Sequence, residues 1–110
     1  MTTEDFVRGV YREQKDLLEF YFSDAPGLDV PPLIREMNLT EEQLVLLQKI
    51  LAAAFRDLSY TFLLGIDGAA QLGGVQHAYR LMDEDDNELS GGEIEGYAWE
   101  YFHGGKGSRI

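Results

Sequence analysis

The sequence contains no cysteine among its 110 residues. A disulfide framework, a zinc–cysteine site and a thiol nucleophile are therefore excluded. Basic residues are scarce as well, because nine Lys and Arg stand against 20 Asp and Glu, which gives a formal net charge of −11. Phosphate backbones and anionic lipids repel such a chain. We therefore expect no direct binding to nucleic acid or to a membrane surface, and we expect partners with basic surfaces.

Long apolar runs are also missing. No stretch approaches the roughly 20 apolar residues that a membrane-spanning helix needs. The N-terminal sequence MTTEDFVRGVYREQ lacks a basic segment followed by an apolar core, so we expect a cytoplasmic protein. What the chain does contain is 45% hydrophobic and 12% aromatic residues. That is enough material for a core, and it predicts one folded domain over residues 1–110.

The N-terminal half predicts two long amphipathic helices. Apolar residues recur every three or four positions over residues 4–22, after a candidate N-cap at Thr2 or Thr3. Thr40–Gln43 (TEEQ) fits a capping box and opens a second helix over 40–64. The apolar arc of this second helix is so broad that we expect it to be the structural centre, covered on most sides. A short helix over 32–37 is expected between the two.

The end of the central helix has two interpretations. Residues 59–66 (SYTFLLGI) fit either the last helical turns or a strand in which apolar side chains alternate. We favour a helix to about Leu64, because no turn signal interrupts Asp57–Ser59 and Gly65 is suited to stop a helix.

The C-terminal half predicts a β-hairpin and a closing helix. Apolar residues alternate over 75–82, residues 83–87 are turn-forming, and Glu88–Ser90 suits a short return strand, which together give a hairpin at 75–90. Ser90–Glu93 (SGGE) matches a second capping box before an amphipathic helix at 93–103, and 104–110 is expected to be a flexible tail. The predicted fold class is therefore α+β: a mainly helical domain with a long central helix, one β-hairpin and a C-terminal amphipathic helix.

Residues 83–102 hold eight of the 20 acidic residues, with no Lys or Arg between Arg80 and Lys106. Because like charges repel, we expect such a stretch either to face water or to bind a positively charged partner. Asp83, Asp85 and Asn87 stand at positions 1, 3 and 5 of an EF-hand-like series, but Glu88 replaces the sixth-position glycine and Ile94 replaces the bidentate glutamate. A solvated turn is favoured over a calcium site, and weak cation binding stays open.

No pattern for catalysis is found. The loop GIDGAAQLGG lacks the Gly-Lys-Ser/Thr ending of a P-loop, and no serine lies in a nucleophile elbow. Pairs of carboxylates such as Glu93 and Glu95 arise by chance in so acidic a chain. His77 and His103, the only histidines, suit structural or surface roles. We predict neither an enzyme nor a bound cofactor or metal.

Trp99 lies off the apolar stripe of the last predicted helix. At about 100° per residue the stripe centres on Tyr101, and Trp99 falls between Glu95 and Gly96. Either Trp99 packs against another element, or it is an exposed anchor for a partner. In the second case Glu95 and Glu100 would flank it with charge suited to a basic partner.

The order of a helical N-terminal half, then YTFLLGIDGAAQLGG, YRLMDEDDNEL and GEIEGYAWEYFHG, resembles small cytoplasmic immunity proteins found beside bacterial polymorphic toxins. The resemblance implies a protein that binds the toxin domain of its own strain and blocks the toxin's active site. Immunity proteins have many unrelated folds, so the resemblance assigns no role to any residue.

The leading functional hypothesis is an immunity-type inhibitor that occludes a basic toxin domain. Its predicted partner-binding residues are Asp83, Glu84, Asp85, Asp86, Glu88, Glu95, Trp99 and Glu100. One alternative is a structural or self-assembling subunit that uses the Tyr- and Trp-rich last helix. Another is a nucleic-acid mimic or adaptor whose acids imitate phosphate spacing. The sequence does not specify the oligomeric state or the identity of the partner.

Overall fold

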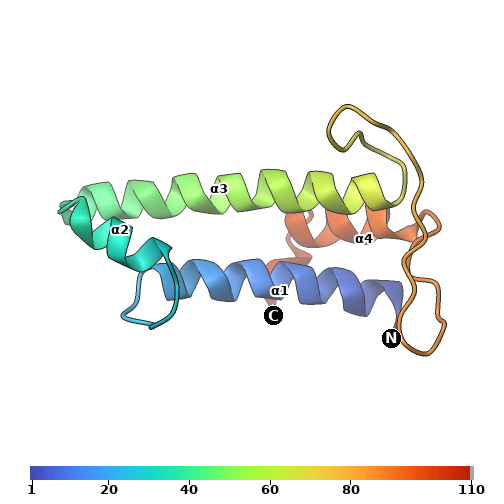
Figure 1. The fold of residues 1–110 in the computed structure, drawn as a ribbon, viewed down its shortest axis with the longest axis horizontal. Helices are drawn as coiled ribbons and strands as arrows, with labels where there is room; N and C mark the ends of the chain where they lie inside the picture. Colours follow the sequence, from blue (N-terminus) through green and yellow to red (C-terminus); the bar gives the residue numbers. More distant parts are fainter. Residues whose placement is uncertain (110) are drawn as a thin grey trace.

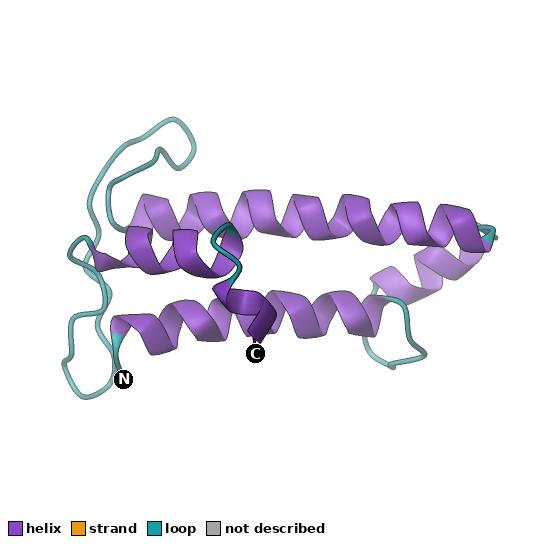
Figure 2. Ribbon diagram, turned by 180° about the vertical axis from the view of Figure 1, so that it is seen from behind, coloured by secondary structure: helices purple, strands orange, loops and turns teal. Residues whose placement is uncertain are grey.

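The structure is a computed structural model that describes residues 1–109. Its elements are α1 (Thr3–Tyr21), α2 (Val30–Glu36), α3 (Glu41–Ile66), α4 (Glu93–Phe102) and the 3₁₀ helix η1 (Lys106–Arg109). Helices α1 and α3 run antiparallel along the length of the molecule, and α2 joins them at one end (Figure 1). Helix α4 packs on the pair at the opposite end, in front of it when the molecule is seen from behind (Figure 2). The long pair accounts for the elongated shape, 46 Å in its longest dimension.

The predicted helix starts are confirmed in two cases by reciprocal capping. The Thr2 hydroxyl accepts a hydrogen bond from the Asp5 backbone N–H at 3.1 Å, and the Asp5 carboxylate accepts one from the Thr2 N–H at 3.0 Å. Thr40 and Gln43 form the same pair of bonds at the start of α3. Both boxes satisfy backbone donors that a helix N-terminus leaves without intrahelical partners.

Helix α3 continues through Ile66, so the strand alternative for residues 59–66 is wrong, as is the predicted stop at Gly65. Gly65 is buried inside the helix, and the Leu72 side chain lies so close that a Cβ at this position would overlap it. The glycine therefore permits a close contact with the loop that follows, rather than ending the helix.

The α+β prediction is wrong, because residues 1–109 form no sheet and no hairpin at 75–90. Only two isolated antiparallel bridges occur in this part of the chain, Leu72–Val75 and Met82–Glu88. The Tyr79 N–H donates to the Ile66 carbonyl at 3.0 Å, at the end of α3. Between 75 and 82 the backbone thus bonds partly to α3 rather than to a partner strand. The described chain is all-α.

The start of α4 also differs from the prediction. Its N-cap is Gly92, at a φ of 110°, and the Ser90 hydroxyl accepts a hydrogen bond from the Leu81 N–H instead of capping the helix. Asp67, just after α3, caps α4 instead. Its carboxylate accepts hydrogen bonds from the Gly91 N–H at 3.1 Å and from the Glu95 N–H at 3.3 Å. A carboxylate suits the positive end of a helix dipole. Asp67 thereby ties the end of α3 to the start of α4.

The hydrophobic core occupies one end of the molecule, where α1, α3 and α4 meet. It consists of Val7, Leu63, Ile66, Ile94, Ala98, Tyr101 and Phe102. The C-terminal stretch expected to be a flexible tail contains η1, whose Gly107 is buried against the Tyr11 ring. The Lys106 ammonium lies 2.7 Å from the Glu4 carboxylate, which joins η1 to α1.

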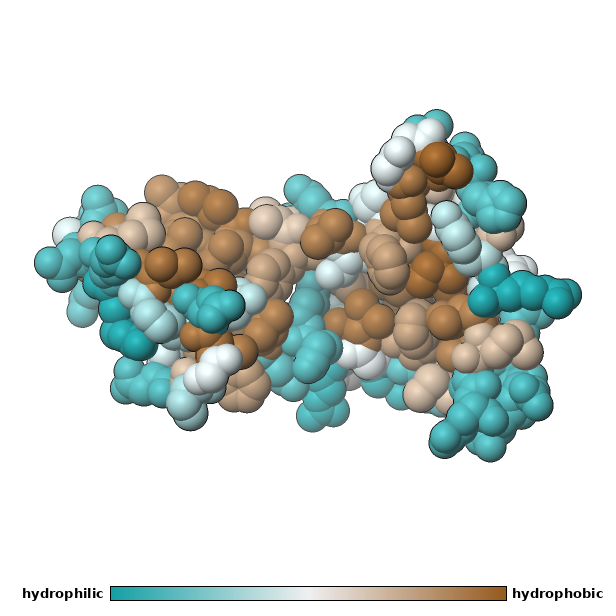
Figure 3. Space-filling model, viewed as in Figure 1, coloured by the Kyte–Doolittle hydropathy of each residue, from teal (hydrophilic) through white to brown (hydrophobic). Residues whose placement is uncertain are grey.

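Away from α4 the helix pair is poorly covered. The expectation that α3 is covered on most sides is wrong, because several of its large apolar side chains are exposed: Leu46 at 58%, Ile50 at 54%, Leu58 at 74% and Phe62 at 52%. On the face of the molecule shown in Figure 3, apolar residues gather over α3 and over the space between α3 and α1. None of the described helices has both the length and the apolar character needed to cross a membrane.

Candidate functional site

The acidic turn is held in one conformation by Asp83. One oxygen of its carboxylate accepts hydrogen bonds from the Asp85 and Asn87 backbone N–H groups, both at 2.9 Å, and the other accepts from the Asn87 side-chain amide at 2.9 Å. These bonds, led by those from Asn87, lower the pKa of Asp83 to about 2. The carboxylate therefore stays ionised where an ordinary aspartate is already half protonated. Asp83 orders the turn more than it presents a charge.

The next three acids project from that ordered turn. Glu84, Asp85 and Asp86 are all exposed, and Asp86 has a φ of 62°, a left-handed conformation that short polar residues tolerate best. None of the three takes part in an ion pair with any residue between 1 and 109. Glu88 is exposed too, 3.5 Å from the Ser90 hydroxyl. The turn thus presents uncompensated negative charge on a fixed backbone.

Trp99 is both packed against another part of the chain and exposed to solvent, the two environments that the sequence left open. Its ring lies so close to Gly104 that a Cβ there would be 2.8 Å from the ring carbon Cζ3, yet the residue is 54% exposed. Glu95, one turn earlier, shares the same side of α4 and is exposed without an ion pair among the described residues. Trp99 therefore packs with one part of its ring and offers the rest to solvent.

Glu100, the other acid predicted to flank Trp99, is engaged by another residue of the fold. It lies about 140° around α4 from Glu95, and its carboxylate is 3.4 Å from the Lys106 ammonium. Lys106 also binds Glu4, and the Tyr101 hydroxyl donates to Glu4 at 2.9 Å. These contacts, with the Lys106 bond the largest, lower the pKa of Glu4 and raise that of Lys106. Glu100 is therefore partly neutralised inside the fold.

The predicted residues share one end of the molecule without forming one compact site. The acidic turn lies beside the N-terminus of α1, whose first turn carries Glu4 and Asp5, and the first turn of α4 adds Glu93 and Glu95 (Figure 1). Arg8, the nearest basic residue of α1, is engaged by Glu4 and Asp5 at 3.4 Å each. We call this region, the turn at 83–88 together with the first turns of α1 and α4, the acidic end.

Within residues 1–109, no group of three or more Asp, Glu or His side chains is arranged to hold a metal ion. In the EF-hand-like series, Asp83 is already bonded to its own turn. The geometry therefore gives no support to the calcium interpretation of this turn.

No family model matches this sequence, and comparison with curated proteins and with solved structures finds no match. The resemblance to immunity proteins therefore rests on the quoted segments alone.

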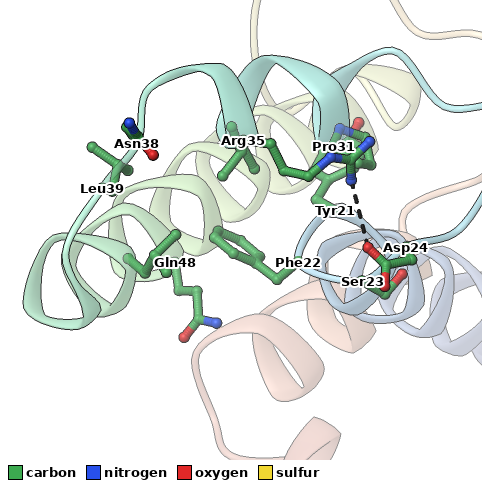
Figure 4. Close-up of a pocket in the computed structure, with 11 residues that line it drawn as sticks. Tyr21, Phe22, Ser23, Asp24, Pro31, Arg35, Asn38, Leu39 and Gln48 are labelled. Carbon is green, nitrogen blue, oxygen red and sulfur yellow. Dashed lines mark ion pairs between the residues drawn. The ribbon is translucent and has the colours of Figure 1, made fainter.

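The hollows along the helix pair include two, one near α2 and one between α1 and α3, that the sequence did not reveal. One, of about 390 Å³, lies between α2 and the ends of α1 and α3 (Figure 4). Its wall is apolar at Phe22 and Leu39 and polar at Gln48, and the Asp24–Arg35 pair spans 3.8 Å at its rim. The other is a groove of about 360 Å³ between α1 and α3. In the sequence, the feature that could have indicated this groove is the unusually broad apolar arc of α3.

Proposed function

We propose that this protein is an immunity-type inhibitor, acting in the cytoplasm, whose acidic end occludes a basic surface on a cognate toxin domain. One observation carries the proposal: Glu84, Asp85 and Asp86 are exposed, fixed on an ordered turn, and not ion-paired within the part of the chain that the structure describes.

Physical reasons favour such a surface for inhibition. A turn that is already ordered loses little conformational entropy when it binds. Uncompensated carboxylates speed the encounter with a basic partner and select against acidic ones. The exposed part of Trp99, beside Glu95, adds an aromatic group of the type that dominates binding energy at protein interfaces. A toxin that binds phosphate through Lys and Arg presents the complementary charge.

The double variant Glu84→Lys/Asp85→Lys is expected to lose at least about 100-fold in affinity for the toxin domain, because two attractions become repulsions. Asp86 is left unchanged because of its left-handed backbone. The partner to test is the C-terminal domain of a toxin-like protein encoded by a neighbouring gene. Affinity is measured by isothermal titration calorimetry, and protection by growth of cells that express both proteins.

The matched control is Glu19→Lys/Glu36→Lys. It makes the same change in net charge at the opposite end, in the last turns of α1 and α2, where a cation suits the helix dipole. This control should protect like the parent. If Glu84→Lys/Asp85→Lys folds and still protects as well as the parent, the acidic end is not the inhibitory surface. Similar affinity for several unrelated DNA-binding proteins would instead favour a nucleic-acid mimic.

A further inference from the structure

We propose a second interaction surface: the open face of the α1/α3 pair, the side away from α4, docks an amphipathic helix of a partner protein that carries Lys or Arg beside its apolar stripe. This inference does not depend on the function proposed for the acidic end. It rests on the shape, the exposure and the charge of a different part of the molecule.

The two sides of the helix pair are covered unequally. On one side, Phe102 of α4 lines a hollow together with Tyr11, Lys15, Leu18 and Arg56. The groove on the open face is lined by Val10, Glu13, Leu17, Tyr21, Leu58 and Ser59 of the same helices, and by Gln14 and Phe55, which line both hollows. Among the described residues, those that line this groove come from α1 and α3 alone. Its mainly apolar lining is of the kind that binds an amphipathic helix.

Helix α3 adds a ridge that meets the groove at Leu58 and turns about 40° around the helix with each step toward Leu46. Five exposed apolar residues follow one another at intervals of four: Leu46, Ile50, Ala54, Leu58 and Phe62. They span about 24 Å of helix at 1.5 Å per residue. Rows of side chains four residues apart interdigitate when two helices pack with an angle of about −50° between their axes. Leu58, at 74% exposure, belongs to both the ridge and the groove, so one docked helix can contact both.

Charge decides between a basic helix and a second copy of this chain. Among the described residues, Glu13 is the one charged residue that lines the groove. The basic residues Lys15 and Arg56 line the hollow on the other side of the pair.

Lys49 lies seven residues before Arg56 and so points to nearly the same side as Arg56. A second copy with a net charge of −11 would bring its own Glu13 to an interface at which the described residues of the groove include no cation. Like charges across an interface cost free energy, whereas Lys or Arg on a partner helix would pair with the Glu13 carboxylate. The open face is therefore better suited to a basic helix than to itself.

The test uses three fluorescein-labelled synthetic peptides of 18 residues. The first contains Leu, Ala and Lys, with the apolar residues on one helical face and Lys on its flanks. The second is a scrambled sequence of the same composition without a stripe, and the third replaces Lys with Glu. By fluorescence anisotropy the first peptide is expected to bind at least tenfold more tightly than the other two.

Variants locate the binding on the open face. Leu58→Gln and Glu13→Lys should each weaken binding of the Lys-flanked peptide at least tenfold. Leu33→Gln is the matched control, because Leu33 is a 59% exposed leucine on α2 outside the groove, and it should bind like the parent.

Three results would overturn the proposal. Equal binding of the scrambled peptide would show attraction by net charge alone. Unchanged binding to Leu58→Gln would place the site elsewhere. A dimer in sedimentation equilibrium that Leu58→Gln converts to a monomer would make a second copy the occupant.

Discussion

Leu63→Ala is expected to lower the free energy of unfolding by about 3 kcal/mol, whereas Leu58→Ala should change it by less than about 0.5 kcal/mol. Leu63 is fully buried in the core formed by α1, α3 and α4, so truncation loses burial and leaves a cavity. Leu58 lies five residues earlier in the same apolar arc but is 74% exposed. Urea unfolding of both variants, followed by far-ultraviolet circular dichroism, gives the two values.

This pair of leucines is informative because a helical wheel places both in the apolar arc of α3. The difference between them is set by which part of this arc α1 and α4 cover. Similar losses for the two variants would mean that Leu58 is covered in solution, and the description of the open face would be wrong.

Gly107→Ala is expected to destabilise the protein by about 1–3 kcal/mol, the usual cost of overpacking. A Cβ at residue 107 would overlap the Tyr11 ring and lie 2.7 Å from the Tyr101 carbonyl oxygen. Tyr11 has little freedom to withdraw, because it packs edge-on against Phe102 with ring centroids 5.1 Å apart. Thermal unfolding measures the change.

Gly96→Ala is the matched control for Gly107→Ala. Gly96 lies within α4, and an added Cβ would have no atom within 4 Å apart from its chain neighbours and the nearby backbone of its own helix. Alanine there should raise stability by about 0.5–1 kcal/mol, because it favours the helix over the unfolded chain. If Gly107→Ala is as stable as the parent, η1 does not pack on α1 as described.

The helices could be predicted from the sequence because their signals are local. Each capping box, at Thr2 and at Thr40, involves residues three apart, and the apolar periodicity of α1 and α3 repeats within a few turns. The interactions that were missed are long-range. Asp67 caps α4 from 24 and 28 residues away, and no local pattern indicates that Ser90 is engaged by Leu81.

The hairpin prediction was wrong because it rested on the alternation of apolar and polar residues over 75–82. A half-buried strand needs that alternation, but the alternation does not ensure that a partner strand is present. The return segment ends at Gly91 and Gly92, both with positive φ. Leu89 is buried, and its carbonyl accepts a hydrogen bond from the Thr3 hydroxyl of α1 at 2.9 Å. The short return segment is thus held by α1 as well as by Leu81, whose carbonyl accepts from the Leu89 N–H at 2.7 Å. A single bridge, Met82–Glu88, remains of the predicted hairpin.

The acidic end was visible in the sequence as a block of charge, but the roles within it were not. Asp83 is engaged by Asn87, and Glu100 by Lys106, so these two predicted binding residues also have structural roles. The open face was missed for a different reason. A broad apolar arc was interpreted as a sign of burial, although it equally fits a helix that leaves part of its arc exposed.

The core occupies the α4 end of the helix pair and leaves the rest of α3 weakly covered. Native-state hydrogen exchange measured by NMR tests this claim residue by residue. The amides of Leu63–Ile66 should show protection close to that of global unfolding, and protection around Leu46–Ile50 should be at least about tenfold lower. Uniform protection along the whole of α3 would contradict the account.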